Sequence, residues 1–239
     1  MRHPSGFRKR FPMTRRLILG LVCLFSATSL WSQTPDLKGW AGFEVKRNYR
    51  KGFDISAQVQ TRWENKLAHF RGNYFSISPS YKLKKNRYLL AETRYATSTR
   101  WDKFRFGTGI VGKHDFGKLD FALKFRYQHE FYLQAWPEIG QNPAKDNFRL
   151  KLSAEYKLHK RLDLGLSVEP VYLLEARIGS LKWIRNTIKL DWEFTKRHHI
   201  EFAYFYQPTF DELEVDQNHV LAFNYAWELR KQKKKKNRK

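Results

Sequence analysis

Cysteine is nearly absent from this sequence, and that absence excludes two kinds of scaffold. Cys23 is the one cysteine in 239 residues, so an internal disulfide framework and a cysteine-rich zinc site are both excluded. Long apolar runs are also missing, because the mean hydropathy is −0.69 and 29% of the residues are charged. A bundle of transmembrane helices is therefore excluded, since each span needs about 20 apolar residues.

Acidic residues are scarce, with 23 Asp and Glu against 46 Lys and Arg, and the pI is about 10.1. Such a basic chain keeps nucleic acid and anionic membranes as candidate partners. Six of the basic residues precede residue 33, however, and eight more follow Leu229. The segment between them is only moderately basic. The whole chain is 41% hydrophobic and 16% aromatic, which argues against a disordered protein.

The first 32 residues have the layout of a secretory signal peptide. Basic residues come first, the apolar run Leu17–Phe25 follows, and small residues occupy positions 26–29. The apolar run is shorter than the roughly 20 residues of a comfortable membrane span. We therefore expect a cleaved signal peptide over residues 1–32 rather than an uncleaved anchor, with cleavage after Ser29 or after Ser32.

Period-two alternation dominates the residues that follow, and no segment stands out with the 3.6-residue period of a helix. Eleven segments alternate apolar and polar side chains, which gives each segment one apolar face and one polar face. In one of them, Leu119, Phe121 and Leu123 oppose Asp120 and Lys124. The expected strands span about 39–47, 52–64, 70–84, 87–98, 102–113, 117–132, 146–159, 161–174, 182–195, 198–209 and 217–230.

Strand length and loop spacing favour a membrane barrel. Many segments reach the 9–11 residues or so that a tilted strand needs to cross a bilayer. Tight turns alternate with longer connections, and aromatic residues gather toward strand ends, as in outer-membrane barrels. We predict an all-β domain over residues 33–230, a single antiparallel transmembrane β-barrel of 10–12 strands. A soluble, secreted β-sandwich with its apolar faces turned inward is the alternative.

The strand count stays open at this point. Single-chain bacterial barrels normally have an even number of strands, whereas eleven segments are found. Either 39–47 is not a full strand, or residues 33–39 add a twelfth, or one strand has been split.

Several motifs resemble the domain-of-unknown-function 2490 family. They are WAGFEV at 40–45, VQTRW at 59–63, SYKL at 80–83, FRYQHEF at 125–131, RLKL at 149–152 and HVLAFNY at 219–225. The resemblance covers nearly all of residues 39–229. It implies an outer-membrane β-barrel of the kind common in Bacteroidetes, and it brings no activity and no functional residues. The chain departs from the usual barrel ending, because a Lys-rich tail follows Trp227 where a terminal aromatic residue is common.

The polar face of the strands would line the lumen of such a barrel, and it interleaves both signs of charge. Paired charges that fill the interior are the simplest interpretation. A narrow passage or a small-ligand site is the alternative, because 10–12 strands lie between filled barrels of about eight and open ones of about sixteen. Mixed charge predicts no strong ion selectivity. The charged residues of this face are Asp54, Arg62, Glu64, Glu92, Arg94, Arg105, Asp120, Lys124, Arg126, Glu130, Arg149, Lys151, Glu155, Lys157, Asp163, Glu169, Arg185, Lys189, Asp191, Glu193, Glu201 and Glu228.

Motifs for catalysis are missing. The sequence has neither a G-x-S-x-G elbow nor an H-E-x-x-H pair. By strand phase, His129 and His219 fall on the apolar side, while His199 shares the lumen side with Glu130 and Glu201. We expect no enzyme, no cofactor, and no catalytic, cofactor-binding or metal-binding residue.

The predicted role is an outer-membrane barrel that acts as a structural or interaction component or as a narrow pore. A lipid-modifying barrel enzyme and a soluble periplasmic β-sheet binding protein are the alternatives. The expected partners are outer-membrane lipid and the barrel assembly machinery, with any small-molecule ligand left open. Nucleic acid is not expected, since a signal peptide exports the chain and the strands separate basic from aromatic residues. The basic tail at 231–239 is a like-charge run that we expect to be disordered.

Overall fold

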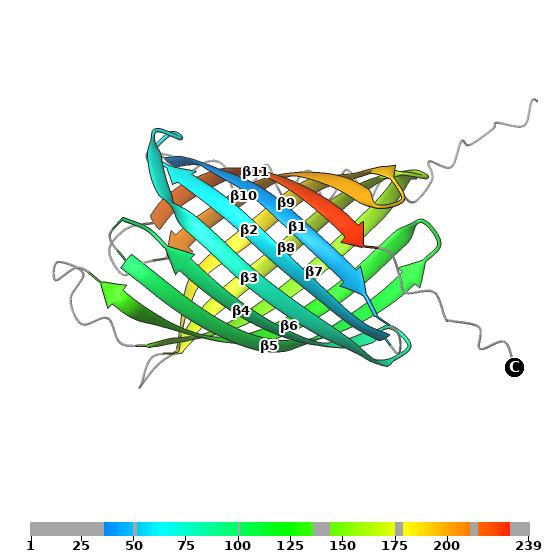
Figure 1. Ribbon diagram of the computed structural model, residues 1–239, viewed down its shortest axis with the longest axis horizontal. Helices are drawn as coiled ribbons and strands as arrows, with labels where there is room; N and C mark the ends of the chain where they lie inside the picture. Colours follow the sequence, from blue (N-terminus) through cyan, green and yellow to red (C-terminus); the bar gives the residue numbers. More distant parts are fainter. Residues whose placement is uncertain are drawn as a thin grey trace, which may run out of the picture. The chain divides into compact units, whose positions relative to one another are not determined.

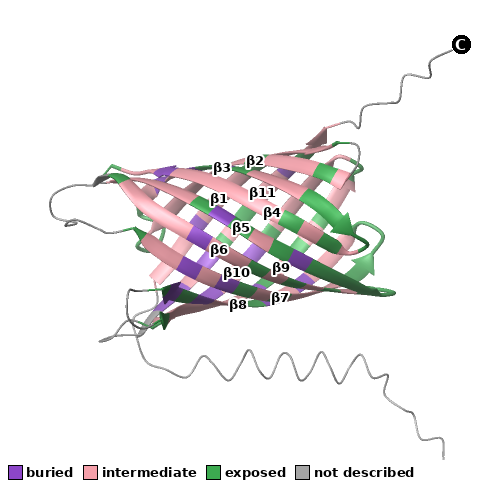
Figure 2. Cartoon of the chain, turned by 90° about the horizontal axis from the view of Figure 1, so that it is seen from below, coloured by how far each residue is buried: buried purple, intermediate pink, exposed green. Residues whose placement is uncertain are grey.

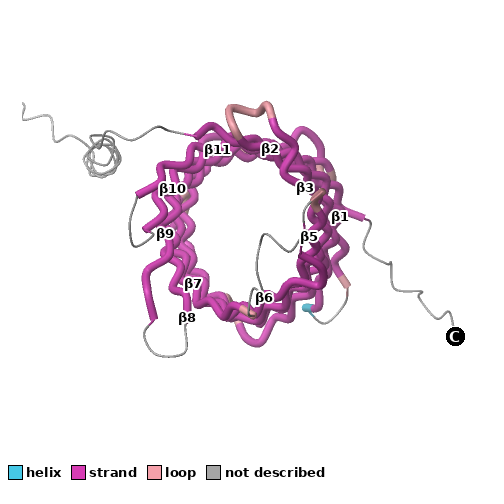
Figure 3. The backbone as a smooth tube through the Cα atoms, turned by 90° about the vertical axis from the view of Figure 1, so that its left-hand side faces the viewer, coloured by secondary structure: helices cyan, strands magenta, loops and turns pink. Residues whose placement is uncertain are grey.

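Eleven strands form a closed barrel in the computed structural model, as Figure 1 and the end-on view of Figure 3 show. The structure describes residues 36–49, 52–99, 101–135, 144–174, 179–210 and 215–229. The predicted signal peptide and basic tail lie outside these residues. The strands are β1 (Asp36–Asn48), β2 (Phe53–Glu64), β3 (His69–Lys84), β4 (Arg87–Thr97), β5 (Trp101–Phe116), β6 (Leu119–Ala135), β7 (Lys145–His159), β8 (Leu162–Leu174), β9 (Gly179–Thr195), β10 (His198–Phe210) and β11 (Val215–Leu229).

The strand prediction is confirmed for each of the eleven expected segments, and the count of eleven falls within the predicted 10–12. The first segment is a full strand of 13 residues, Asp36–Asn48. No twelfth strand occurs among the described residues. Within that same part of the chain, no helix has the length and apolar character needed to cross a membrane.

One pair of strands departs from the predicted antiparallel order. Each strand pairs antiparallel with its neighbour in sequence, but β1 and β11 close the barrel in parallel, from Asp36 opposite Asn218 to Arg47 opposite Leu229. Figure 1 shows the two running side by side in the same direction, β1 in blue and β11 in red. The reason is the odd count, because reversing direction at every step leaves the first and eleventh strands pointing the same way.

The two ends of the barrel differ in their connections, as the alternation of turns and loops predicted. At one end, here called the turn side, β3 joins β4 through Lys85–Asn86 and β5 joins β6 through Gly117–Lys118. Asn86 and Gly117 adopt positive φ angles of 64° and 68°, which tight hairpins require. The opposite, loop side carries the longer connections between β6 and β7, β8 and β9, and β10 and β11.

Alternation along the strands places apolar side chains outside and polar ones inside. Leu123 and Leu152 on the outer face are 51% and 57% exposed, whereas Arg149 and Glu169 in the lumen are 7% and 3% exposed. Figure 2 shows buried and exposed positions alternating along individual strands. This arrangement contradicts the sandwich alternative, because a sandwich buries its apolar faces between two sheets.

A glycine of β5 permits the close approach of β6 and offers a test of this packing. A Cβ at Gly109 would overlap the carbonyl oxygen of Phe125 and lie 2.7 Å from Cγ of Arg126. At Gly112, on the same strand, a Cβ would meet nothing within 4 Å. The two glycines therefore form a matched pair for substitution.

We expect Gly109→Ala to lower the stability of the barrel by about 1–3 kcal/mol, the usual cost of overpacking. Gly112→Ala should be neutral or stabilise by up to about 1 kcal/mol, because alanine restricts the unfolded chain. The measurement is the temperature at which the fast-migrating, unboiled band disappears from a gel. Equal temperatures for both variants would contradict the β5–β6 register.

Candidate functional site

Six arginines gather in the lumen, each from a different strand, because alternate residues of a strand share a face. Two direct cross-strand pairs bring four of them together, Arg94 opposite Arg105 and Arg126 opposite Arg149. All six belong to the lumen face that the sequence predicted. We call the following residues the arginine cluster: Arg62 (β2), Arg94 (β4), Arg105 (β5), Arg126 (β6), Arg149 (β7) and Arg185 (β9).

Glu92 on β4 is the first of two carboxylates that compensate the cluster. Its oxygens accept hydrogen bonds from Nη2 of Arg105 at 2.6 Å and from Nη1 of Arg126 at 3.1 Å. Nη2 of Arg94 lies 3.5 Å from the same carboxylate. One negative charge therefore faces three positive ones.

Glu169 on β8 is the second carboxylate. Arg149 donates to it from Nε at 3.1 Å and from Nη2 at 2.7 Å, a two-pronged contact that matches the guanidinium fork to the carboxylate. Nη2 of Arg126 donates to the same group at 3.1 Å. Arg126 thus joins the two carboxylates into one network that spans β4 to β8.

Arg62 and Arg185 are held by aromatic rings instead of carboxylates. The guanidinium of Arg62 lies 4.0 Å from the ring centre of Trp40 and 3.8 Å from that of Tyr74. That of Arg185 lies 4.8 Å from the Trp183 ring. Amide oxygens accept their hydrogen bonds, and neither arginine forms an ion pair within the described residues. Cation–π contact therefore supplies the compensation that acidic groups supply elsewhere in the cluster.

Several buried donors in the cluster lack an acceptor in the described part of the chain. They are Nε of Arg94, Arg105 and Arg126, and Nε2 of Gln128. Gln128 is 2% exposed, and its Oε1 accepts from Arg149 at 3.2 Å. Buried donors are normally paired, so the cluster has a surplus of donors as well as a surplus of positive charge.

Two spaces inside the barrel meet at Trp40. A cavity of about 390 Å³ lies on the loop side and is lined by five arginines of the cluster, all except Arg126. A second space of about 200 Å³ on the turn side is lined by Glu44, Lys46, His199 and Glu201. Trp40 lines both spaces and packs on Phe205 with ring centres 5.2 Å apart, so it lies between them.

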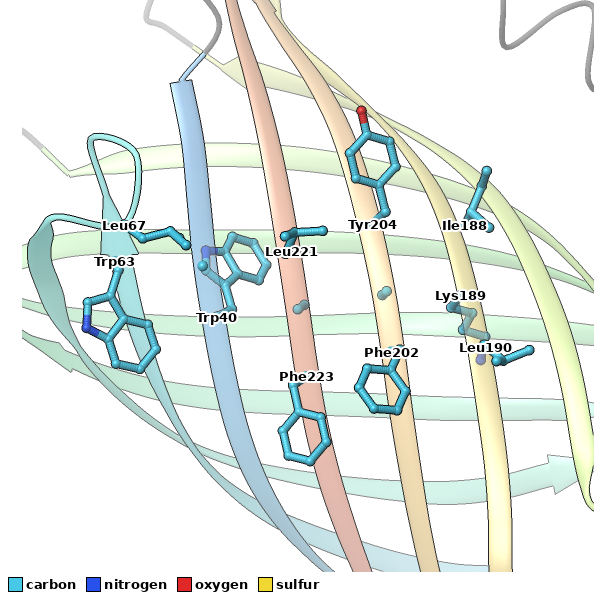
Figure 4. Close-up of a pocket in the computed structure, with 13 residues that line it drawn as sticks. Trp40, Trp63, Leu67, Ile188, Lys189, Leu190, Phe202, Tyr204, Leu221 and Phe223 are labelled. Carbon is cyan, nitrogen blue, oxygen red and sulfur yellow. The ribbon is translucent and has the colours of Figure 1, made fainter.

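A larger, shallow groove of about 690 Å³ lies on the outside of the barrel across β1, β11, β10 and β9. Figure 4 shows apolar side chains over it, among them Trp63, Leu221 and Phe223, with Trp40 on the other side of the sheet. This groove is separate from the arginine cluster and is part of the apolar outer surface.

The histidines occupy the faces that strand phase predicted. His129 lies on the outer face, where its Nδ1 is 2.8 Å from Oδ1 of Asp146, and His219 lies there beside the Tyr204 hydroxyl at 2.6 Å. His199 is on the lumen side, 3.8 Å from Asp191 and from Glu228. No group of three or more potential metal ligands of the His, Cys, Asp and Glu types is found among the described residues.

Sequence reasoning missed the aromatic side chains inside the lumen. Trp40 and Trp183 are absent from the predicted lumen face, yet both contact cluster arginines. Strand alternation alone could have placed them there, because Trp183 is two residues from Arg185 and Trp40 is four residues from Glu44. Residues an even number of positions apart on a strand share a face. The prediction of paired charges in the lumen holds for such pairs as Lys189–Glu155 at 2.7 Å and fails within the cluster, where the charges do not balance.

A family model described as "Protein of unknown function (DUF2490)" matches residues 37–218. The chain belongs to this family. The resemblance inferred from the sequence motifs is thereby confirmed. The match covers strands β1 to β10 and the start of β11, so it includes every member of the arginine cluster.

No curated protein matches this chain, whereas several solved structures do. A KdgM porin has 15% sequence identity and a TM-score of 0.44, over 69% of this chain and 81% of that one. A NanC porin has 12% identity and a TM-score of 0.48, over 72% of this chain and 86% of that one. OmpT, an outer membrane protein of Vibrio cholerae, has 10% identity and a TM-score of 0.37, over 69% and 59%.

Substitution of Glu169 tests how much the network contributes to the stability of the barrel. We expect Glu169→Gln to destabilise the barrel by roughly 3–5 kcal/mol, because it leaves Arg126 and Arg149 buried with less compensation. Glu228→Gln is the matched control. Glu228 is about one-third exposed and 3.8 Å from His199, and such pairs contribute about 0–1 kcal/mol. Urea unfolding of the refolded chain in detergent measures both, and equal losses would refute the network.

Proposed function

We propose that this protein is a narrow pore of the outer membrane whose lumen favours anions. The observation that carries the proposal is the unequal charge of the arginine cluster, six guanidinium groups around two carboxylates. The closed barrel with an apolar outside and a polar inside supports the location, and the position of Trp40 between the two lumen spaces supports the small width.

The outer surface supports a membrane environment. Large apolar side chains are exposed on it over many strands, including Ile77, Leu123, Leu152, Phe202 and Leu221, each at least half exposed. Soluble monomers rarely expose contiguous apolar patches beyond a few hundred Å². A lipid bilayer removes this cost, because hydrocarbon tails solvate such side chains.

The strand count and the side chains inside the lumen favour a pore of small conductance. Eleven strands lie between the roughly eight of a filled barrel and the sixteen of an open one, and Trp40 stands between the loop-side and turn-side spaces. Rings of Arg and Lys favour anions in pores. The sequence predicted no strong selectivity because the total lumen charge is mixed, but the positive groups are concentrated at one level of the lumen.

The membrane location can be tested on one strand of the outer face. We expect Leu152→Arg, at the centre of β7, to destabilise the folded barrel in lipid by about 2–4 kcal/mol. Leu158→Arg, close to the turn-side end of the same strand, should cost only about 0–1 kcal/mol. The measurement is the yield of heat-modifiable barrel in outer-membrane fractions. Recovery of the unaltered chain and both variants in the soluble periplasm, in equal amounts, would overturn the proposed location.

The pore itself can be tested by conductance in planar bilayers under a potassium chloride gradient. We expect a reversal potential that indicates preference for chloride. The double variant Arg62→Gln/Arg185→Gln should lower the chloride-to-potassium permeability ratio by at least about fivefold, because each of the two lost unit charges, at about 4 Å in water, contributes about 1 kcal/mol.

The matched control for this variant is Arg47→Gln/Arg161→Gln, which removes the same charge at the turn-side end. Arg47 lies over the Tyr49 ring and Arg161 donates to the carbonyl oxygen of Phe194, both away from the loop-side cavity. Its permeability ratio should equal that of the unaltered chain. A correctly folded barrel that carries no current would reject the pore and favour a structural role.

A further inference from the structure

The residues that line the loop-side cavity carry more positive charge than negative charge. We call it the arginine pocket and define it by Arg62, Arg94, Arg105, Arg149 and Arg185, with Trp40 and Trp183. Glu92 and Glu169, the partners of three of these arginines, do not line the cavity. Glu92 instead lines a separate space of about 160 Å³ together with Arg126. The lining of the loop-side cavity therefore contains these arginines without their counter-charges.

The surplus of guanidinium charge points to an anionic ligand with several acceptor oxygens. Arg94 and Arg105 line the pocket, whereas their unpaired Nε atoms are buried away from it. Arg62 and Arg185 have amide acceptors but no carboxylate. Glu130, the carboxylate that lines the cavity, is paired with Lys103 at 3.1 Å. An oxyanion entering the pocket would therefore meet several guanidinium groups and little repulsion.

Aromatic rings hold the guanidinium groups of Arg62 and Arg185 in place before any ligand binds. Arg62 is in contact with two rings, those of Trp40 and Tyr74, and Arg185 contacts Trp183 at 4.8 Å and Trp40 at 5.1 Å. A stacked guanidinium keeps its in-plane N–H groups available, in a fork that matches the two oxygens of a carboxylate or phosphate. Because the side chains are already ordered, less conformational entropy is lost when a ligand binds.

The pocket is larger than a halide ion needs. Its volume of about 390 Å³ lies in the range of small-molecule sites, roughly 300–1,000 Å³. A bare chloride ion would fill a small part of it and would use few of its donors. The position inside the lumen also separates the pocket from lipid on the outer face.

We propose that the arginine pocket binds an organic solute of about monosaccharide size through its carboxylate or phosphate group. This inference rests on the proposed pore function, for which it names the solute class, but binding can be measured without any current. Occupancy of the pocket would place the solute beside Trp40, at the narrow level between the two spaces of the lumen.

Isothermal titration calorimetry of the full chain, refolded in a detergent with a neutral headgroup, tests the proposal. The three probes are glucose, glucuronate and glucose 6-phosphate, which share a ring and differ in charge. We expect glucuronate or glucose 6-phosphate to bind and glucose not to bind, and the stronger of the two identifies the oxyanion. Heat released equally by all three, or by none, would overturn the proposal.

Variants locate the binding. Arg62→Gln/Arg185→Gln should weaken the affinity for the charged probe by about tenfold or more, since hydrogen bonds to charged groups are the strong ones. Arg47→Gln/Arg161→Gln should leave it unchanged. Arg62→Lys/Arg185→Lys keeps the charge but loses the fork, so an affinity below that of the unaltered chain is expected. Unboiled migration on a gel verifies that each variant is folded.

The outcomes separate this inference from the pore. A chain that binds glucuronate but carries no current keeps the pocket and rejects the pore. A chain that conducts chloride but binds neither charged probe rejects the pocket alone. Equal affinity of the Arg62→Gln/Arg185→Gln variant and the unaltered chain would place the binding elsewhere and overturn the assignment.

Discussion

The parallel contact between β1 and β11 is the pairing on which the rest of the structure depends, because it closes the sheet. Twelve consecutive residue pairs form it, from Asp36 with Asn218 to Arg47 with Leu229. Without it, two strand edges would expose unpaired N–H and C=O groups, which a closed barrel avoids. Closure also creates the lumen, where four arginines from four strands share two carboxylates.

Charge compensation in the lumen follows from that closure. Arg126 binds Glu92 and Glu169 and so connects the wall of β4 and β5 with that of β7 and β8. The position of the arginines in the lumen brings them into contact with their partners and also places most of them at the wall of the loop-side cavity. Glu92 and Glu169 stabilise four of the guanidinium groups and aromatic rings hold the other two, while five of the six arginines line the loop-side cavity. The same side chains thus form a structural network and a positively charged cavity wall.

Strand phase was readable because it is a local property. Each residue's face depends on its immediate neighbours alone, so Arg126 and Arg149 could be assigned to the lumen and His129 and His219 to the outside. Which side chains meet across the lumen is set by register and curvature over all eleven strands. The stacking of Arg62 on Trp40 and Tyr74, for example, joins residues of β1, β2 and β3 whose contact no local pattern encodes.

The sequence by itself determined the all-β class, the positions of eleven strands, the family and the charged face, since period-two alternation and turn residues act over a few residues. The tertiary structure alone decided the parallel closure, the position of Trp40 between two lumen spaces and the sharing of Glu92 and Glu169 among four arginines. These features depend on distances between residues far apart in the chain, which arise only when the barrel closes.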